Sequence, residues 1–379
     1  MCPSPSSSSP QPESPRPVDP PPCADVYDRA QVSIATSALL PTLCKIWTTG
    51  AVNTVSVVCS RFYGTVPGEE RLKALAKEAR EREKAVGDGW RQRVAIVTGS
   101  NTGIGFITAK TLALANYRVI LACRSEAQGK QAEQEIREET GNESVEWMSL
   151  DLASFSSIRA FAKAFSSLQI PLHLLINNAG VMNCPFQRTE DGFELQFGVN
   201  HLGHFLLTNL LLDKIKSSAP SRIINLTSNA HFASRGVNYS TVQSNKGYSG
   251  LGKYADSKLA NVLFTKALQD KLVGKGVCVM AVDPGPIATG LYRTTPGAMQ
   301  MMRFLSGWTF LTPVEGAVTT VYAALSSEVE GFRGEYLFNQ CTRHPNPYAL
   351  RRSDQKELWT RSVKWTGLDK EERDKTPEY

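Results

Sequence analysis

Short apolar runs alternate with longer amphipathic stretches from residue 93 onward. The apolar runs lie at residues 93–98, 118–123, 145–149, 172–177, 221–228, 277–283 and 335–339. Stretches with helical spacing of apolar side chains lie near 104–115, 126–139, 155–168, 190–216, 253–274 and 313–326. This alternation is typical of parallel strands covered by helices on both faces. The pattern therefore predicts an α/β fold, a doubly wound (Rossmann-type) sheet of seven parallel strands that binds ligands at the carboxyl ends of its strands.

The first ninety residues lack this alternation. Residues 1–22 contain nine Pro and six Ser, which is too little apolar surface to order a segment, so we expect residues 1–30 to form a disordered tail. Residues 31–60 are more apolar but contain no uninterrupted run of about twenty apolar residues. A packed or interfacial helix is favoured there over a membrane span, and peripheral membrane attachment stays open.

A charged stretch at residues 68–93 leads into the first strand. Apolar side chains recur in it at helical spacing, at Leu72, Leu75, Ala76 and Ala79. We expect a solvated helix here rather than a helix that binds a partner. The chain then divides into a helical extension at 31–90, one α/β domain at 91–368 and a charged tail at 369–379.

Composition excludes some classes of function. The chain has 42 basic and 36 acidic residues and a net charge of +6, and because the two signs are mixed, nucleic-acid binding is not implied. The eight cysteines form no Cys-x-x-Cys pair, which suits a reduced intracellular compartment. His201 and His204 lie three residues apart, but no third ligand motif accompanies them, so we expect packing or cofactor-shell positions and no metal site.

A glycine-rich turn follows the first predicted strand. It comprises Gly99, Asn101, Thr102, Gly103, Ile104 and Gly105. Glycine permits a tight bend and close approach of a diphosphate, while the N-terminus of the next helix supplies N–H groups and positive dipole. The turn therefore predicts a dinucleotide site.

Three further motifs lie at predicted strand ends or on a helix. Tyr254 and Lys258 are four residues apart and share one helical face. Ser228 ends the strand that begins at Arg222, and Asn177-Asn178-Ala179-Gly180 ends another strand. A lone Tyr-x3-Lys pair is common by chance, but the ordered set behind a glycine turn is not plausibly accidental.

With these motifs the chain resembles the short-chain dehydrogenase/reductase family, and its retinol dehydrogenase branch in particular. The stretches 177–182, 190–194, 199–208 and 257–264 carry that likeness. Residues 329–368 are similar to the family's dehydrogenase/reductase on chromosome X, which implies polyprenol and dolichal chemistry. The resemblance covers about residues 91–368 and implies no function for the segment before it.

The resemblance implies a catalytic set. Tyr254 would act as acid in reduction and base in oxidation, and Lys258 would favour the phenolate and bind the nicotinamide ribose. A free phenol has a pKa of about 10, so a neighbouring ammonium is needed to lower it. Ser228 would donate a hydrogen bond to the substrate oxygen, and Asn200 would hold a relay water beside Lys258.

The cofactor is expected to be NADP, because Arg124 ends the second strand where an acidic residue would select NAD. Glu126 nearby keeps NAD open. By resemblance, Asp151 is expected to meet the adenine amino group. The alternative is that Asp151 is the N-cap of the helix that follows. By resemblance, the other cofactor contacts are Asn178, Ala179, Pro284, Gly285, Ile287 and Thr289.

The expected substrate is a lipophilic aldehyde or ketone, such as a retinoid or isoprenoid, and its alcohol. Residues 231–252 form an extra loop beside the site, and residues 290–312 are rich in Met and aromatic side chains, as a lid over a long apolar substrate would be. The alternative is a non-catalytic protein that senses NADPH and binds a partner. A location in the cytoplasm or on the cytosolic face of the endoplasmic reticulum, a lipid droplet or a mitochondrion fits both, and a homodimer stays open.

Overall fold

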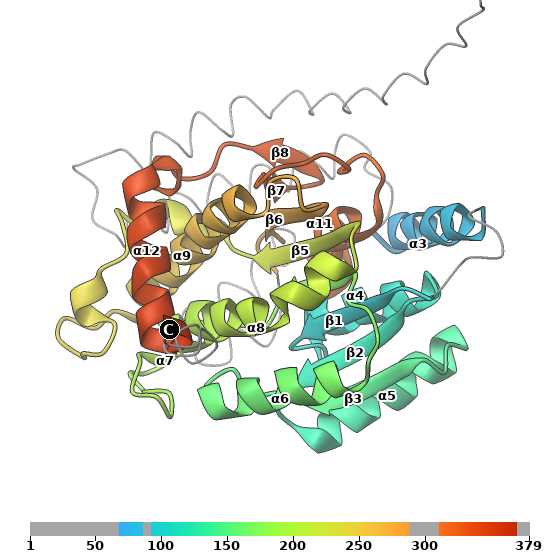
Figure 1. Cartoon of the computed structure of the whole chain (residues 1–379), viewed down its shortest axis with the longest axis horizontal. Helices are drawn as coiled ribbons and strands as arrows, with labels where there is room; N and C mark the ends of the chain where they lie inside the picture. Colours follow the sequence, from blue (N-terminus) through green and yellow to red (C-terminus); the bar gives the residue numbers. More distant parts are fainter. Residues whose placement is uncertain (1–67, 86–91, 288–310, 370–379) are drawn as a thin grey trace, which may run out of the picture.

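The computed structural model of the chain describes residues 68–85, 92–287 and 311–369. Figure 1 shows a central sheet with helices on both sides. Its strands are β1 (Val94–Thr98), β2 (Arg118–Cys123), β3 (Val145–Ser149), β4 (Leu174–Asn177), β5 (Ser221–Leu226), β6 (Val277–Asp283), β7 (Tyr336–Phe338) and β8 (Cys341–Arg343). The main helices are α3 (Gly68–Lys84), α4 (Gly103–Leu114), α5 (Glu126–Thr140), α6 (Phe155–Ser167), α8 (His204–Ser217), α9 (Gly250–Lys271), α11 (Pro313–Leu325) and α12 (Arg352–Thr366).

Among the described residues, the strands form one sheet in the order β3-β2-β1-β4-β5-β6-β7-β8. The pairs from β3 to β7 are all parallel. The reversal of strand order between β1 and β4 places the carboxyl ends of these two strands beside a crevice. The doubly wound Rossmann-type architecture is thereby confirmed.

One detail is corrected: the sheet has eight strands, and β8 runs antiparallel to β7. Asn339 and Gln340 join the two strands, and both have positive φ angles, of 50° and 61°. Such angles are typical of a tight hairpin whose twist matches that of the strands. The strand of three residues and the Asn-Gln pair, in place of the usual Asn-Gly, gave no clear hairpin signal.

The two faces of the sheet are separated by the alternation of side chains along each strand. In β1, Val94 and Ile96 pack with α6, α8, α9 and α12 on one face. Ala95 and Val97 pack with α3, α4, α5 and α11 on the other face. Both faces of a parallel sheet are therefore buried, which is why its strands have continuous apolar sequences.

The sequence predicts a solvated helix at residues 68–93, but the structure shows that α3 is packed along one face. Its apolar stripe is buried against α4 and α11, with Leu75 only 1% exposed. Arg82 donates a hydrogen bond to the carbonyl of Leu325 at the end of α11. A guanidinium at that position complements the negative end of the α11 dipole. The buried stripe and this contact make α3, the helix before β1, part of the α/β core.

The helix expected at 190–216 is divided. A short helix, α7 (Leu195–Phe197), leads into η2 (Gly198–Gly203), a π-helix that continues as α8. The structure also adds α12, which contacts α9 and is seen next to it in Figure 1. It was not predicted because its apolar residues are few. In the parts of the chain that the structure describes, no helix has the length and apolar content needed to cross a membrane. Residues 31–60 and 290–310 lie outside those parts.

Candidate functional site

Backbone geometry determines the glycine-rich turn between β1 and α4. Gly99 and Gly103 have φ angles of +64° and +61°, which side-chain-bearing residues rarely adopt. A Cβ on Gly105 would lie 2.3 Å from the carbonyl oxygen of Gly99 and 2.5 Å from the side-chain nitrogen Nδ2 of Asn178. Thr102 is the N-cap of α4, but its side chain makes no capping hydrogen bond. The N–H groups in the first turn of α4 therefore receive no hydrogen bond from the N-cap side chain.

The hydroxyl of Thr98 holds the segment that faces this turn. The amide N–H groups of Asn178 and Ala179 both donate to Thr98 Oγ1, each over 2.9 Å. The Asn178 side chain donates to the carbonyl of Thr98 over 2.7 Å. The end of β4 is thereby attached to the end of β1, as their adjacent parallel pairing allows.

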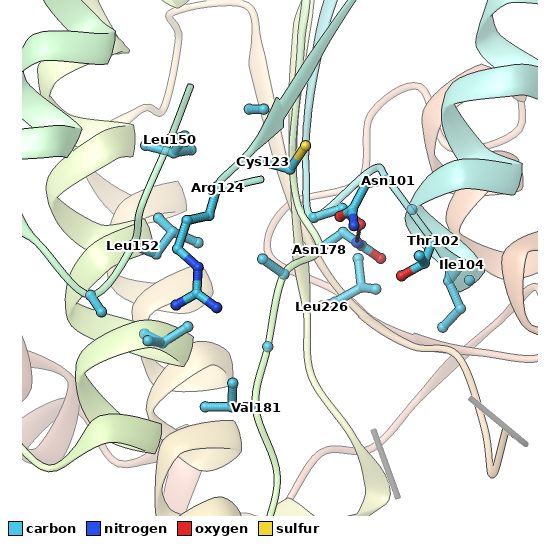
Figure 2. Close-up of a pocket in the computed structure, with 18 of the residues that line it drawn as sticks. Asn101, Thr102, Ile104, Cys123, Arg124, Leu150, Leu152, Asn178, Val181 and Leu226 are labelled. Carbon is cyan, nitrogen blue, oxygen red and sulfur yellow. Dashed lines mark hydrogen bonds between the residues drawn. The ribbon is translucent and has the colours of Figure 1, made fainter. Parts of the chain in front are cut away.

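A cavity of about 720 Å³ lies at the carboxyl ends of the strands. Its lining includes the predicted residues Gly99, Asn101, Thr102, Gly103, Ile104, Gly105, Arg124, Asp151, Asn178, Ala179, Tyr254, Lys258 and Pro284. Figure 2 shows Arg124 extended into this pocket, with Asn101, Thr102 and Ile104 along another side. A single cavity therefore brings together most of the residues expected to bind cofactor and the Tyr-Lys pair.

Asp151 is not the cap of the following helix. Ser154 is the N-cap of α6, and its side chain accepts from the N–H of Ser157. Asp151 Oδ1 accepts from the N–H of Ala153 over 2.9 Å, and its Oδ2 lies 3.8 Å from an Arg124 nitrogen. The Arg124 side chain is 79% exposed, so its guanidinium is accessible to a ligand in the pocket.

Tyr254 and Lys258 lie on one face of α9 and are both nearly buried, at 6% and 4% exposure. Lys258 Nζ lies 5.6 Å from the centre of the Tyr254 ring and donates to the carbonyl of Leu226 over 3.2 Å. Burial lowers the pKa of Lys258 to about 8, and the charge of Asp283 opposes that shift. The ammonium is therefore a poorly solvated charge beside the phenol.

Asn200 lies in the π-helix η2, a helix type that is frequent at functional sites. Its Oδ1 accepts from the N–H of Val181 over 2.8 Å, and its Nδ2 donates to the Val181 carbonyl over 2.9 Å. Nδ2 also lies 3.0 Å from Ser257 Oγ. Asn200 is fully buried and does not line the cavity. Its side chain instead hydrogen-bonds to the backbone of Val181, which does line the cavity.

Ser228 follows β5 and is half-buried. Its hydroxyl donates to Asn229 Oδ1 over 3.1 Å and accepts from the N–H of Ala230 over 3.3 Å, which caps the short helix η3 (Asn229–Ala233). Ser228 does not line the cavity itself, although its neighbour Thr227 does. The structure thus places Ser228 one residue beyond the cavity-lining Thr227.

The remaining predicted contacts follow β6. Gly285 has a φ of +82°, and its N–H donates to Asp283 Oδ1 over 2.9 Å. Ile287 is buried and pairs with Leu311 in an isolated parallel bridge. Gly285 and Ile287 do not line the cavity. Thr289 lies outside the described residues.

Sequence reasoning missed Asp283 and Thr98. Asp283 is 1% exposed, accepts from the Tyr336 hydroxyl over 2.9 Å, and has its pKa raised to about 6 by burial. An acidic residue at the end of the apolar run 277–283 was an available signal. The hydroxyl of Thr98, immediately before Gly99, was another.

Both histidines of the π-helix region, His201 and His204, are buried. His201 Nε2 lies 2.9 Å from Ser362 Oγ of α12, and burial lowers the pKa of His201 to about 3. His204 is 2% exposed, and burial lowers its pKa to about 4. Within the described ranges, no group of three or more His, Cys, Asp or Glu side chains is arranged to hold a metal ion.

The chain belongs to the short chain dehydrogenase family, whose model matches residues 93–298. This makes it an oxidoreductase of the Rossmann-type class that the fold and the glycine turn indicate. Polyprenol dehydrogenase of Homo sapiens is 45% identical over 283 residues, which cover 73% of this chain and 86% of that protein. Retinol dehydrogenase 11 of Mus musculus is 51% identical over 252 residues, which cover 66% of this chain and 78% of that protein.

Solved structures agree on the fold. An uncharacterised protein of Mycobacterium paratuberculosis is 33% identical, with a TM-score of 0.58 over 73% of this chain and 94% of that chain. L-Sorbose reductase of Gluconobacter frateurii, solved with NADPH and L-sorbose, is 20% identical with a TM-score of 0.52 over 65% of this chain and 94% of that chain. At that identity the likeness indicates the fold alone.

Proposed function

We propose that the protein is an NADP(H)-dependent oxidoreductase that interconverts a lipophilic aldehyde or ketone, retinoid or isoprenoid, with its alcohol. The observation that carries this proposal is the single cavity shared by the glycine turn, Tyr254 and Lys258. The similarity to a polyprenol dehydrogenase and a retinol dehydrogenase supports the substrate class.

The residues at the glycine turn fit a dinucleotide. Since a Cβ at Gly105 would meet backbone at 2.3 Å, the turn has the tight backbone approach that a diphosphate requires. The start of α4 offers N–H groups and the positive end of its dipole. Asn178 and Ala179 would lie under the adenosine ribose, and Ile287 and Thr289 would contact the nicotinamide side.

A bound nicotinamide dinucleotide supplies or accepts the hydride. In reduction, Tyr254 donates its hydroxyl proton to the substrate oxygen; in oxidation, its phenolate removes the alcohol proton. The Lys258 ammonium stabilises the phenolate and would bind the nicotinamide ribose. The Ser228 hydroxyl donates a hydrogen bond to the substrate oxygen and stabilises its developing charge.

Arg124 supports a preference for NADP over NAD. Its exposed guanidinium reaches the cavity from the end of β2, where it can bind a 2′-phosphate with two parallel hydrogen bonds. Asp151, whose Oδ2 lies 3.8 Å from the guanidinium, would meet the adenine amino group.

A lipophilic substrate partitions into membranes, so we propose that the enzyme works at the cytosolic face of a membrane. Fractionation of cells that express the full chain tests this point: recovery of all the protein in the soluble fraction at low and high salt contradicts it.

The decisive experiment is an activity screen of the purified full chain with NADPH and with NADH. The substrates are all-trans-retinal, a polyprenal and dolichal, and the corresponding alcohols with NADP⁺ and NAD⁺. We expect faster turnover with NADPH and at least one of these aldehydes. No cofactor oxidation or reduction with any lipophilic carbonyl or alcohol contradicts the proposal.

A further inference from the structure

We infer that His204 is a positioning residue that couples the dinucleotide-binding segment Asn178–Val181 to Asn200 through a closed ring of hydrogen bonds. The two nitrogens of its ring contact two different parts of the site. Nδ1 lies 3.0 Å from the carbonyl oxygen of Asn200, and Nε2 lies 2.9 Å from the hydroxyl of Thr98. The inference adds a role for a buried side chain that the proposed mechanism does not use.

Hydrogen-bond chemistry defines the tautomer of His204. The Asn200 carbonyl can only accept, so Nδ1 must carry the proton. The ring is neutral because burial lowers its pKa to about 4, so Nε2 is an acceptor. The Thr98 hydroxyl must then donate to Nε2, which leaves its lone pairs for the N–H groups of Asn178 and Ala179. The carbonyl of Ile176 is a second acceptor within reach of the Thr98 hydroxyl, but at 3.4 Å it is farther than His204 Nε2 at 2.9 Å.

The ring closes through Asn200. Its side chain makes two hydrogen bonds to the backbone of Val181, so the cavity-lining segment is held at one end by Thr98 and at the other by Asn200. Between them, Gly180 lies so close to Asn200 that an added Cβ would be 3.2 Å from Oδ1 and 3.6 Å from Lys258 Nζ. His204 is the link between the two holding groups.

The π-helix makes this link available. The N–H of His204 donates to the carbonyl of His201, three residues before it. In a regular α-helix that N–H would bond the carbonyl four residues before, which is Asn200. The local change of helix type instead leaves the Asn200 carbonyl to the His204 ring. Because Thr98 and Asn200 are fully buried, loss of the ring nitrogens leaves polar groups unpaired beside the cavity.

His201 provides a matched control. It lies in the same π-helix, is fully buried, and its Nε2 contacts Ser362 of α12, which is not a member of the proposed ring. Its ring packs among Phe197, Phe205 and Phe264. A His201→Phe variant therefore removes a buried imidazole of the same size without touching the proposed ring.

The test separates the two contacts of His204 by substitution. His204→Asn keeps a donor near Nδ1 for the Asn200 carbonyl but loses the contact with Thr98. We expect its dissociation constant for NADPH, from fluorescence titration without substrate, to rise about tenfold while kcat at saturating cofactor changes little. His204→Gln keeps an acceptor near Nε2, and we expect the reverse: a near-normal dissociation constant and a kcat lowered about tenfold.

His204→Phe should show both losses, and His201→Phe neither. The inference rests on the proposed function for its kcat measurement, but the NADPH titration does not require turnover. If wild-type protein binds no dinucleotide, the proposed function is wrong. If wild-type protein binds NADPH and the Asn and Gln variants lose affinity and kcat in equal proportion, or not at all, the coupling by His204 is wrong and the proposed function stands.

Discussion

The two ends of the cavity are built in different ways. At the dinucleotide end, residues 98–105 form a turn in which backbone sterics and positive φ angles at glycine determine the shape. At the catalytic end, Asn200 comes from η2, Ser228 from the segment after β5, and Tyr254 and Lys258 from α9. A buried cation, Lys258, and a buried carboxylate, Asp283, lie near one another there. The comparison teaches that substitutions at the dinucleotide end should alter the affinity for the dinucleotide. Substitutions at the catalytic end should alter the turnover rate or its pH dependence.

The largest effect is expected from Tyr254→Phe. The change removes the hydroxyl and keeps the packing of the ring with Met182 and Ala230. We expect kcat to fall roughly 10²- to 10⁴-fold, because general acid–base catalysis contributes about that much. The NADPH dissociation constant should stay unchanged, since the hydroxyl acts at the catalytic end.

Tyr248→Phe is the control for that variant. The Tyr248 hydroxyl donates to the carbonyl of Cys184 over 2.7 Å, away from Lys258, and its loss should leave kcat within about threefold of wild type. Equal loss in the two variants contradicts the assignment of Tyr254. Cellular activity retained in Tyr254→Phe favours the non-catalytic NADPH-sensing role.

Gly105→Ala tests the dinucleotide end of the cavity. Its Cβ would lie 2.3 Å from the Gly99 carbonyl oxygen, so the turn must shift, at a cost of about 1–3 kcal/mol. We expect NADPH affinity to fall by roughly tenfold to a hundredfold and the melting temperature to fall. Gly252→Ala, whose Cβ would come no closer than 3.3 Å to Ser249, should retain both values. Normal NADPH affinity in Gly105→Ala rules out the turn as the diphosphate site.

Arg124→Ala sharpens the comparison within the dinucleotide end. Loss of a guanidinium that binds a 2′-phosphate should raise KM for NADPH about tenfold and leave KM for NADH nearly unchanged. Arg118→Ala, at the start of the same strand and paired with Glu146 over 2.6 Å, is the control. A parallel rise of both KM values in Arg124→Ala contradicts the proposed cofactor preference.

The smallest effect concerns pH at the catalytic end. Burial lowers the pKa of Lys258 to about 8, so the ammonium is present below that pH and lost above it. We expect kcat/KM to fall above about pH 8, approaching about tenfold per unit. Asp283, whose charge raises the pKa of Lys258, should support the ammonium, so Asp283→Asn should move the decline to lower pH. If the pH profile of kcat/KM is the same in Asp283→Asn and wild type, the decline above pH 8 is caused by titration of a group other than Lys258.

Much of the fold could be predicted because most strands between residues 94 and 283, such as β1, β2, β4 and β6, are buried apolar runs with clear boundaries. The predicted strand 118–123 and helix 126–139 agree with β2 and α5 to within one residue. Strand β8 escaped because its residues, Cys341–Arg343, are partly exposed and form no apolar run, whereas the equally short β7 is apolar and buried. Helix α12 escaped because its stability depends on aromatic contacts with other elements, such as that of Trp359 with Phe205 at 5.1 Å between ring centres.

The order of residues along the chain was enough to indicate the glycine turn, the Tyr-Lys pair on one helix and their place at strand ends, because these depend on local spacing. Folding alone determined that Arg124 lines a shared cavity, that Ser228 and Asn200 are neighbours of its lining residues Thr227 and Val181, and that burial shifts the pKa values of Lys258 and Asp283. Those properties arise from burial and from contacts between residues up to about a hundred positions apart, and no local pattern encodes such desolvation. The link from Thr98 through His204 to Asn200 is of the same kind, since its donors and acceptors meet only when β1 and the π-helix pack together.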